Sequence, residues 1–205
     1  EYRRRVGGLM DALTASGDTT IFWVGIPPMA NGERFETRYT LINDIVRESA
    51  APKGSVYHFF PTGKQQIATE ALDVYSERVQ AFIEAALASR HAPADKVKAL
   101  FDAFAQRAEE GRFRTSCAVG TVSLDLDDDV AGLREVLARA LEAWIEQIAG
   151  HFDAGDAKRA RSFAGLLMTA IEGAYVRARA EASSRAFREA GTWLATLARQ
   201  EFPRT

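Results

Sequence analysis

The stretch "TLINDIVRESAAPKGSVYHFFPTGKQQ", residues 40–66, is the most informative part of the chain. Residues 40–50 are typical of a helix of about ten residues with inward-facing aliphatic side chains. A turn is expected at Ala50–Ala51, and Pro52 suits the first position of a second, short helix over 52–59. A buried helix that braces a second helix against the major groove is the arrangement of a helix–turn–helix. The stretch therefore predicts a DNA-binding head.

The second of these helices exposes polar side chains that suit a nucleic-acid surface. Short polar residues read base edges, while Tyr, His and Lys side chains donate to phosphates. Lys64 and the free backbone N–H groups after Thr62 offer one more seat for a phosphate. On this short helix the candidates are Lys53, Ser55, Tyr57 and His58.

From residue 62 onward the sequence predicts one helix after another, and so an all-α fold. The segment 112–127 is expected to hold one short helix. Capping residues, prolines and glycines mark the other helix ends. The expected boundary residues are the capping box of Thr62 with Gln65, then Pro93, Gly111, Asp127 or Asp128, Gly150, Asp156, and Ser183 or Ser184.

Apolar residues recur at helical spacing in these helices and are expected to form the core. In the last helix the expected stripe is Phe187, Trp193, Leu194, Leu197 and Phe202. Eight residues of the helical region have two readings, because they either line a ligand cavity between helices or fill a dry core. They are Phe101, Phe104, Phe113, Cys117, Trp144, Met168, Ile171 and Tyr175.

The composition is that of a globular chain in a reducing compartment. The chain has 205 residues, 47% of them hydrophobic, and a net charge of −2, so DNA binding must depend on local charge. One cysteine excludes an internal disulfide framework. No apolar run approaches a membrane span, and the N-terminus "EYRRRVGGLMDALTAS" lacks the apolar region of a signal peptide. We therefore expect a cytoplasmic protein with no membrane partner.

Residues 40–66 resemble the helix–turn–helix of the tetracycline-repressor (TetR) family. The family pattern runs roughly I-A-x-x-A-G-V-x-x-G-x-[LV]-Y-x-[HY]-F-x-x-K, and the spacer in "FPTGK" is similar to that of the multidrug-resistance repressor branch. "RTSCAVGTVSLDL" and "AIEGAYVRAR" look like that branch's ligand-sensing domain, so the resemblance covers about residues 40–202. The matching positions in the motif are Ile45, Gly54, Val56, Tyr57, Phe59 or Phe60, and Lys64.

This resemblance implies a homodimeric repressor that a small hydrophobic effector releases from a double-stranded DNA operator. The last two helices, about 156–202, would pair across a two-fold axis. By match to the motif, Thr40, Tyr57 and Lys64 would contact phosphates. Lys53, Ser55 and His58 would lie in or beside the groove. Ala50 or Ala51 stands where the family usually has a turn glycine.

The first 39 residues depart from that family, which needs a first helix shortly before Thr40. "TTIFWVGIPP" (19–28) is typical of a strand, while residues 3–15 have the spacing of an amphipathic helix. Residues 1–45 resemble a fragment of an SGNH-type hydrolase. We expect an atypical segment at 1–39, a helix–turn–helix region with its connecting helix at 40–89, and a ligand-binding and dimerisation domain at 90–205.

The sequence offers no catalytic residue and no metal site. His91 and His151 have no Cys or His at ligand spacing, and the acidic run 125–129 lacks the pattern of a calcium loop. No nucleophile motif such as G-x-S-x-G appears, so we expect neither an enzyme nor a cofactor. Cys117 is expected to be a small buried group, since a redox sensor needs a lowered pKa. One alternative remains open: a helical ligand-binding dimer whose chimeric N-terminus has abolished DNA binding.

Overall fold

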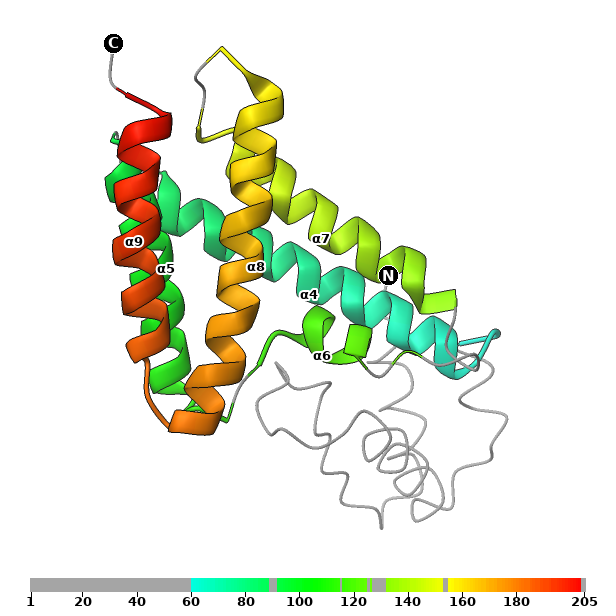
Figure 1. Ribbon diagram of the computed structural model, residues 1–205. Helices are drawn as coiled ribbons and strands as arrows, with labels where there is room; N and C mark the ends of the chain where they lie inside the picture. Colours follow the sequence, from blue (N-terminus) through cyan, green and yellow to red (C-terminus); the bar gives the residue numbers. More distant parts are fainter. Residues whose placement is uncertain are drawn as a thin grey trace.

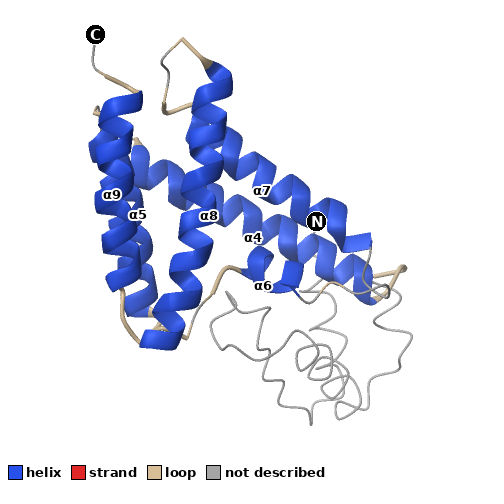
Figure 2. Ribbon diagram, in the orientation of Figure 1, coloured by secondary structure: helices blue, strands red, loops and turns tan. Residues whose placement is uncertain are grey.

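The computed structural model describes residues 60–88, 92–114, 116–124, 126, 132–152 and 155–203. Within these ranges the regular structure is entirely helical, which confirms the predicted all-α class (Figure 2). The predicted strand at 19–28 and the helix–turn–helix at 40–59 lie outside the described residues. The helices are α4 (Lys64–Leu87), α5 (Pro93–Glu110), α6 (Ala118–Leu124), α7 (Arg134–Ala149), α8 (Ala157–Glu181) and α9 (Arg185–Glu201).

The start of α4 differs from the predicted capping box. The backbone N–H and the hydroxyl of Thr62 both hydrogen-bond Oε1 of Gln66, at 3.2 and 3.3 Å, so the partner is Gln66 and not Gln65. Gly63 is the N-cap, with a φ of 70°. Because that left-handed conformation favours glycine, it sets the turn and moves the reciprocal contact one residue along the helix.

Most other helix ends follow the sequence signals. Pro93 is the first residue of α5 and Gly111 its C-cap, and Gly150 closes α7. Oδ1 of Asp156 accepts a hydrogen bond from the backbone N–H of Arg159 at 3.0 Å, as the capping prediction required. The predicted caps Asp127 and Asp128 lie outside the described residues.

Ser184 is the N-cap of α9, but its hydroxyl serves another element. Its Oγ donates to Oε1 of Glu109 near the end of α5, at 2.5 Å. The N–H of Arg185 is satisfied by the hydroxyl of Ser183 at 3.2 Å. Ser183 therefore caps the first backbone N–H of α9, whereas Ser184 connects the start of α9 to α5.

The helices form two sets that cross each other (Figure 1). One set is α5, α8 and α9, which run side by side, with α5 packed most extensively against α9. The other is α4 and α7, which lie together and pass obliquely behind α8. The short α6 lies against α4 and α7. The core fills the space between the two sets.

Aromatic side chains occupy both ends of this core. Near the end of α9, Phe152, Phe163 and Phe202 pack with ring centroids 5.2–5.5 Å apart. Toward the α8–α9 turn, Tyr175 packs edge-on against Phe187 at 5.0 Å. Such ring pairs stabilise the fold by about 0.5–1.5 kcal/mol each beyond their buried area.

The predicted core position of Trp193 is wrong. The indole is 78% exposed, whereas α9 buries Phe187, Gly191, Ala195 and Ala198. These four recur every three or four residues, and position 193 falls on the opposite side of the helix. Val176 and Leu166 on α8 are also exposed, so the outer faces of α8 and α9 carry unburied apolar side chains.

No helix in the described part of the chain is long and apolar enough to cross a membrane.

Candidate ligand pocket

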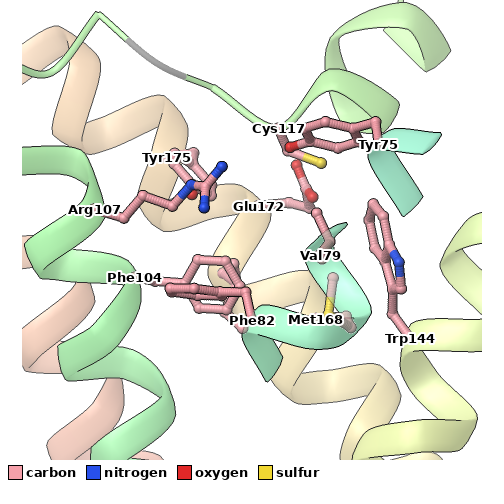
Figure 3. A pocket seen from close by; sticks show the side chains of 11 residues that line it. Tyr75, Val79, Phe82, Phe104, Arg107, Cys117, Trp144, Met168, Glu172 and Tyr175 are labelled. Carbon is pink, nitrogen blue, oxygen red and sulfur yellow. The ribbon is translucent and has the colours of Figure 1, made fainter. Parts of the chain in front are cut away.

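A pocket lies where α4, α5, α7 and α8 meet the start of α6 (Figure 3). Its walls are largely aromatic, and its polar groups come from three separate helices and the turn before α6. The lining residues are Tyr75, Val79, Phe82, Phe104, Arg107, Cys117, Trp144, Met168, Ile171, Glu172 and Tyr175.

The aromatic walls are held by ring contacts between helices. Phe104 of α5 packs edge-on against Phe82 of α4 at 4.9 Å and against Tyr175 of α8 at 6.0 Å. Tyr75 of α4 packs edge-on against Trp144 of α7 at 6.2 Å. Because four helices each contribute a ring, the shape of the pocket depends on how those helices sit against one another.

Hydrogen bonds fix the α4 side of the pocket. The Tyr75 hydroxyl accepts from the backbone N–H of Ala118 at the start of α6, at 3.3 Å. The Trp144 indole N–H donates to the backbone carbonyl of Ser76 at 3.2 Å. Thus α6 and α7 both hold α4 through groups that border the pocket.

A carboxyl and a thiol form the polar end of the pocket. Glu172 is hydrogen-bonded to the thiol of Cys117, which also accepts the N–H of Gly120 at 3.4 Å. Oε1 of Glu172 is buried and has no hydrogen-bond partner. A buried polar atom left without a partner is costly, by about 1–3 kcal/mol.

Burial controls the protonation of this end. It raises the pKa of the Glu172 carboxyl, and the hydrogen bond from Cys117 offsets part of the rise. Burial first, and then the nearby Glu172, raise the pKa of the Cys117 thiol well above its ordinary value. The low pKa that a redox-sensing cysteine needs is therefore missing, in agreement with the predicted buried structural role.

Gly120 makes room for the carboxyl. A Cβ at this position would lie 2.3 Å from Oε2 of Glu172, closer than side-chain carbons approach oxygens in proteins. The glycine in "CAVGTV" therefore lets α6 approach α8 with a carboxyl between them.

On the α5 side a cation borders the pocket. The Arg107 guanidinium lies over the ring of Phe82, 5.2 Å from its centroid, and is half-buried. The pocket thus carries one positive group on α5 and one ionisable carboxyl on α8. The space between the side chains is small: about 10 Å³ is free for the centre of a water molecule, which is room for about one. Among the described residues, no group of three or more His, Cys, Asp or Glu is placed to hold a metal ion.

Six of the eight residues named as candidate ligand contacts from the sequence lie around this pocket: Phe104, Cys117, Trp144, Met168, Ile171 and Tyr175. The other two lie elsewhere. Phe101 is fully buried and its Cβ faces Gly191 of α9, whereas Phe113 lies in the turn after α5 and packs partly buried against the core. Of the candidate DNA contacts, Lys64 begins α4; Thr40, Lys53, Ser55, Tyr57 and His58 lie outside the described residues.

The sequence did not predict the pocket residues of α4 or the two charged lining residues, Arg107 and Glu172. Tyr75, Val79 and Phe82 recur at helical spacing, which does not distinguish a pocket wall from ordinary core packing. For Glu172 a weak signal exists, because it lies four residues after Met168 and three before Tyr175, which are both on the buried stripe of α8.

Comparison with known proteins places the chain in a family. Residues 93–192 match the model described as "Transcriptional regulator LmrA/YxaF-like, C-terminal domain". An uncharacterized HTH-type transcriptional regulator of Mycobacterium tuberculosis is 34% identical over 147 residues, which cover 68% of this chain and 74% of that protein. HTH-type transcriptional regulator LmrA of Bacillus subtilis is 30% identical over 105 residues, 51% of this chain and 56% of LmrA.

A solved structure agrees with these sequence relatives. A TetR transcriptional regulator from Chloroflexus aurantiacus superposes with a TM-score of 0.66 at 26% identity, covering 97% of this chain and 94% of that one. The chain is therefore a member of the TetR family of transcriptional regulators. This confirms the TetR family that the resemblance of residues 40–202 implied, whereas the multidrug-resistance branch stays a prediction.

The first part of the chain matches a different family model. Residues 1–71 match "Protein of unknown function (DUF459)". The match covers the segment in which the sequence departs from the TetR pattern and extends into α4. It assigns no activity, so the likeness of residues 1–45 to an SGNH-type hydrolase stays a prediction.

Proposed function

We propose that this regulator represses transcription as a homodimer and leaves its operator when a small hydrophobic ligand fills the pocket between α4, α5, α7 and α8. The observation that carries the proposal is the position of α4. This helix begins at Lys64, directly after the segment expected to read DNA, and it supplies Tyr75, Val79 and Phe82 to the pocket. A ligand that separates the pocket walls must therefore act on the helix that connects to the reading head.

The contacts of α4 give the ligand a route to that head. The Tyr75 hydroxyl holds the first turn of α6, and Trp144 of α7 holds the Ser76 carbonyl. Both groups line or border the pocket, so a ligand that moves them loosens α4 from its neighbours. A ligand shifts DNA affinity only by the difference in its own affinity for the two positions of α4.

The dimer is proposed to form through α8 and α9, within the 156–202 region expected from the sequence. Val176 and Trp193 are 66% and 78% exposed, and Leu166 is exposed on α8 as well. Large apolar side chains left exposed on neighbouring helices are a feature of protein interfaces. A two-fold pair built on these helices would leave both α4 starts free to face the same duplex.

The DNA contacts are proposed to be those of the motif match. Thr40, Tyr57 and Lys64 contact phosphates, and Lys53, Ser55 and His58 lie in or beside the major groove. The domain limits follow the same scheme: 1–39, 40–89 and 90–205.

Fluorescence anisotropy with a labelled palindrome from the gene's own promoter tests the DNA-binding part. We expect tight binding that weakens steeply with salt, because phosphate contacts release counterions. Tyr57→Ala and Lys64→Ala should weaken binding to all sequences alike. Lys98→Ala is the matched control, since Lys98 is an exposed lysine of α5 that pairs with Asp102 within its own helix. Equal binding by wild type and both variants would contradict the assignment.

A second function is favoured by the family match of residues 1–71: a dimer that binds ligand and no longer binds DNA. In this case the replaced N-terminus removes the brace of the reading helix. Limited proteolysis that cleaves within 1–50 and leaves 62–202 intact, together with absent operator binding, would support this version. Ester hydrolysis by the purified chain would instead support the hydrolase resemblance, and we expect none.

A further inference from the structure

Glu172 is the one acidic residue among the pocket's lining residues, and one of its two carboxyl oxygens has no hydrogen-bond partner. Oε2 faces Cys117 and the space left by Gly120, whereas Oε1 is buried without a hydrogen-bond partner. Around it stand the rings of Tyr75, Trp144 and the other aromatic walls (Figure 3). Oε1 is a hydrogen-bond acceptor without a donor in an apolar pocket. A ligand donor that reaches it forms a stronger hydrogen bond than it would in water, because the surroundings have a low dielectric constant.

We propose that Glu172 is the polar anchor of the pocket and selects an aromatic effector carrying a hydrogen-bond donor, an O–H or N–H group, that reaches Oε1. This inference rests on the proposed function for its pocket, and it adds the chemical class of the effector and the residue that reads it. The ring of the effector packs among the aromatic walls, while its donor satisfies the buried oxygen. An aromatic hydrocarbon without a donor leaves that oxygen unpaired and binds more weakly.

The charges around Glu172 suit a ligand that carries a hydrogen-bond donor better than a ligand that carries a carboxylate. The titratable groups that face it are Cys117 from the turn before α6, Tyr75 from α4, Tyr175 from its own helix and Arg107 from α5. Arg107 already lies over the Phe82 ring, at the opposite wall. An anionic ligand placed at Oε1 would meet a second acceptor, whereas an alcohol or an ammonium group would complete the site.

The pocket must widen to admit such a molecule. It now has room for about one water. Met168 and Arg107 are the lining side chains that give way most readily, since the first is unbranched and flexible and the second is half-exposed. The movement of these walls is the event that the proposed function couples to α4.

Calorimetry with four matched probes tests the anchor: 2-naphthylmethanol, 2-naphthylmethylamine, 2-methylnaphthalene and 2-naphthoate. We expect the alcohol and the amine to bind wild type about tenfold more tightly than the hydrocarbon, or more. Glu172→Leu should abolish this advantage for both donors. Glu172→Gln keeps an acceptor oxygen but no charge, so it should retain the advantage for the alcohol and lose most of it for the amine. Glu77→Gln, at an exposed carboxylate of α4, should change nothing.

Circular dichroism checks that each variant is folded, and the isosteric Gln variant keeps the test decisive if the Leu variant does not fold. The inference is overturned if no probe binds, if the hydrocarbon or the naphthoate binds wild type as tightly as the donors, or if the donors keep their advantage in Glu172→Leu. Operator release is measured separately by anisotropy. If the alcohol and the amine bind through Glu172 but do not release DNA, the proposed function is wrong, while the role of Glu172 as a ligand anchor is supported. If ligands release DNA but bind Glu172→Leu as tightly as wild type, the proposed function is supported and the role of Glu172 is wrong.

Discussion

The indole Nε1 of Trp144 lies 3.2 Å from the backbone oxygen of Ser76, and this buried hydrogen bond joins α7 to α4. Trp144 is fully buried, borders the pocket and packs edge-on against Tyr75. One side chain therefore contributes to the core, to the pocket wall and to the attachment of α4.

Truncating Trp144 should destabilise the domain strongly. We expect Trp144→Ala to lower the free energy of unfolding by about 3–5 kcal/mol, since it leaves a large cavity. Trp144→Phe keeps most of the apolar volume but loses the N–H donor, so a smaller loss of about 1–3 kcal/mol is expected. Urea denaturation followed by far-ultraviolet circular dichroism measures both. A Trp144→Phe variant as stable as wild type would mean that the hydrogen bond adds nothing to packing.

Glu172 should make stability depend on pH in a defined direction. Its pKa is raised in the folded chain because the carboxyl is buried, so the folded state holds the proton more strongly than the unfolded state. The stabilisation is complete below the ordinary value of 4.5 and is lost as the pH rises through the folded pKa. We expect Glu172→Gln to gain stability relative to wild type as the pH rises over that window. Urea titrations from pH 4 upward would show it, and parallel curves for the two proteins would contradict it.

Gly191 should not tolerate a methyl group. A Cβ there would lie 2.7 Å from Cβ of Phe101, within the contact between α9 and α5. We expect Gly191→Ala to cost about 1–3 kcal/mol, because neither helix can shift without disturbing the core. Gly150→Ala is the matched control: its φ is −59° and a Cβ would meet only ordinary contacts at 3.5 Å or beyond. The midpoint temperature of thermal unfolding should be lower than that of wild type for Gly191→Ala only.

Trp193→Glu should separate the proposed dimer without unfolding the chain. The indole is largely exposed in the single chain, so its loss costs the monomer little, whereas a buried carboxylate at an interface is costly. Size-exclusion chromatography with light scattering should give the mass of one chain for the variant and of two for wild type. Leu124→Glu, at an exposed leucine that ends α6 and belongs to neither α8 nor α9, should stay dimeric. A dimeric Trp193→Glu variant would place the interface elsewhere.

Local chemistry made the helix ends predictable. Pro93, Gly111, Gly150 and Asp156 act through their own backbone geometry or one short-range hydrogen bond, so the sequence around each suffices. The cap of α4 was wrong by one residue because the left-handed conformation of Gly63 was not foreseen.

Features that depend on distant elements were harder to predict. The surroundings of Glu172 depend on α6, about fifty residues earlier in the chain, which carries Gly120 beside its carboxyl, and the pattern on α8 gives only a weak signal of this. The predicted burial of Trp193 was wrong for a related reason. An aromatic residue was assigned to the core by its type, whereas the phase set by Phe187, Gly191 and Ala195 turns it outward.

Two of the acceptors through which α7 holds α4 are main-chain carbonyls: that of Ser76 accepts the indole N–H of Trp144, and that of Gln80 accepts the side-chain amide of Gln147 at 3.0 Å. A carbonyl is present whatever side chain the codon specifies. Divergent relatives can therefore exchange the amino acids at 76 and 80, within the space available, while the grip persists as long as the donors on α7 are kept. For these two hydrogen bonds, substitutions should therefore be tolerated better at positions 76 and 80 of α4 than at Trp144 and Gln147 of α7.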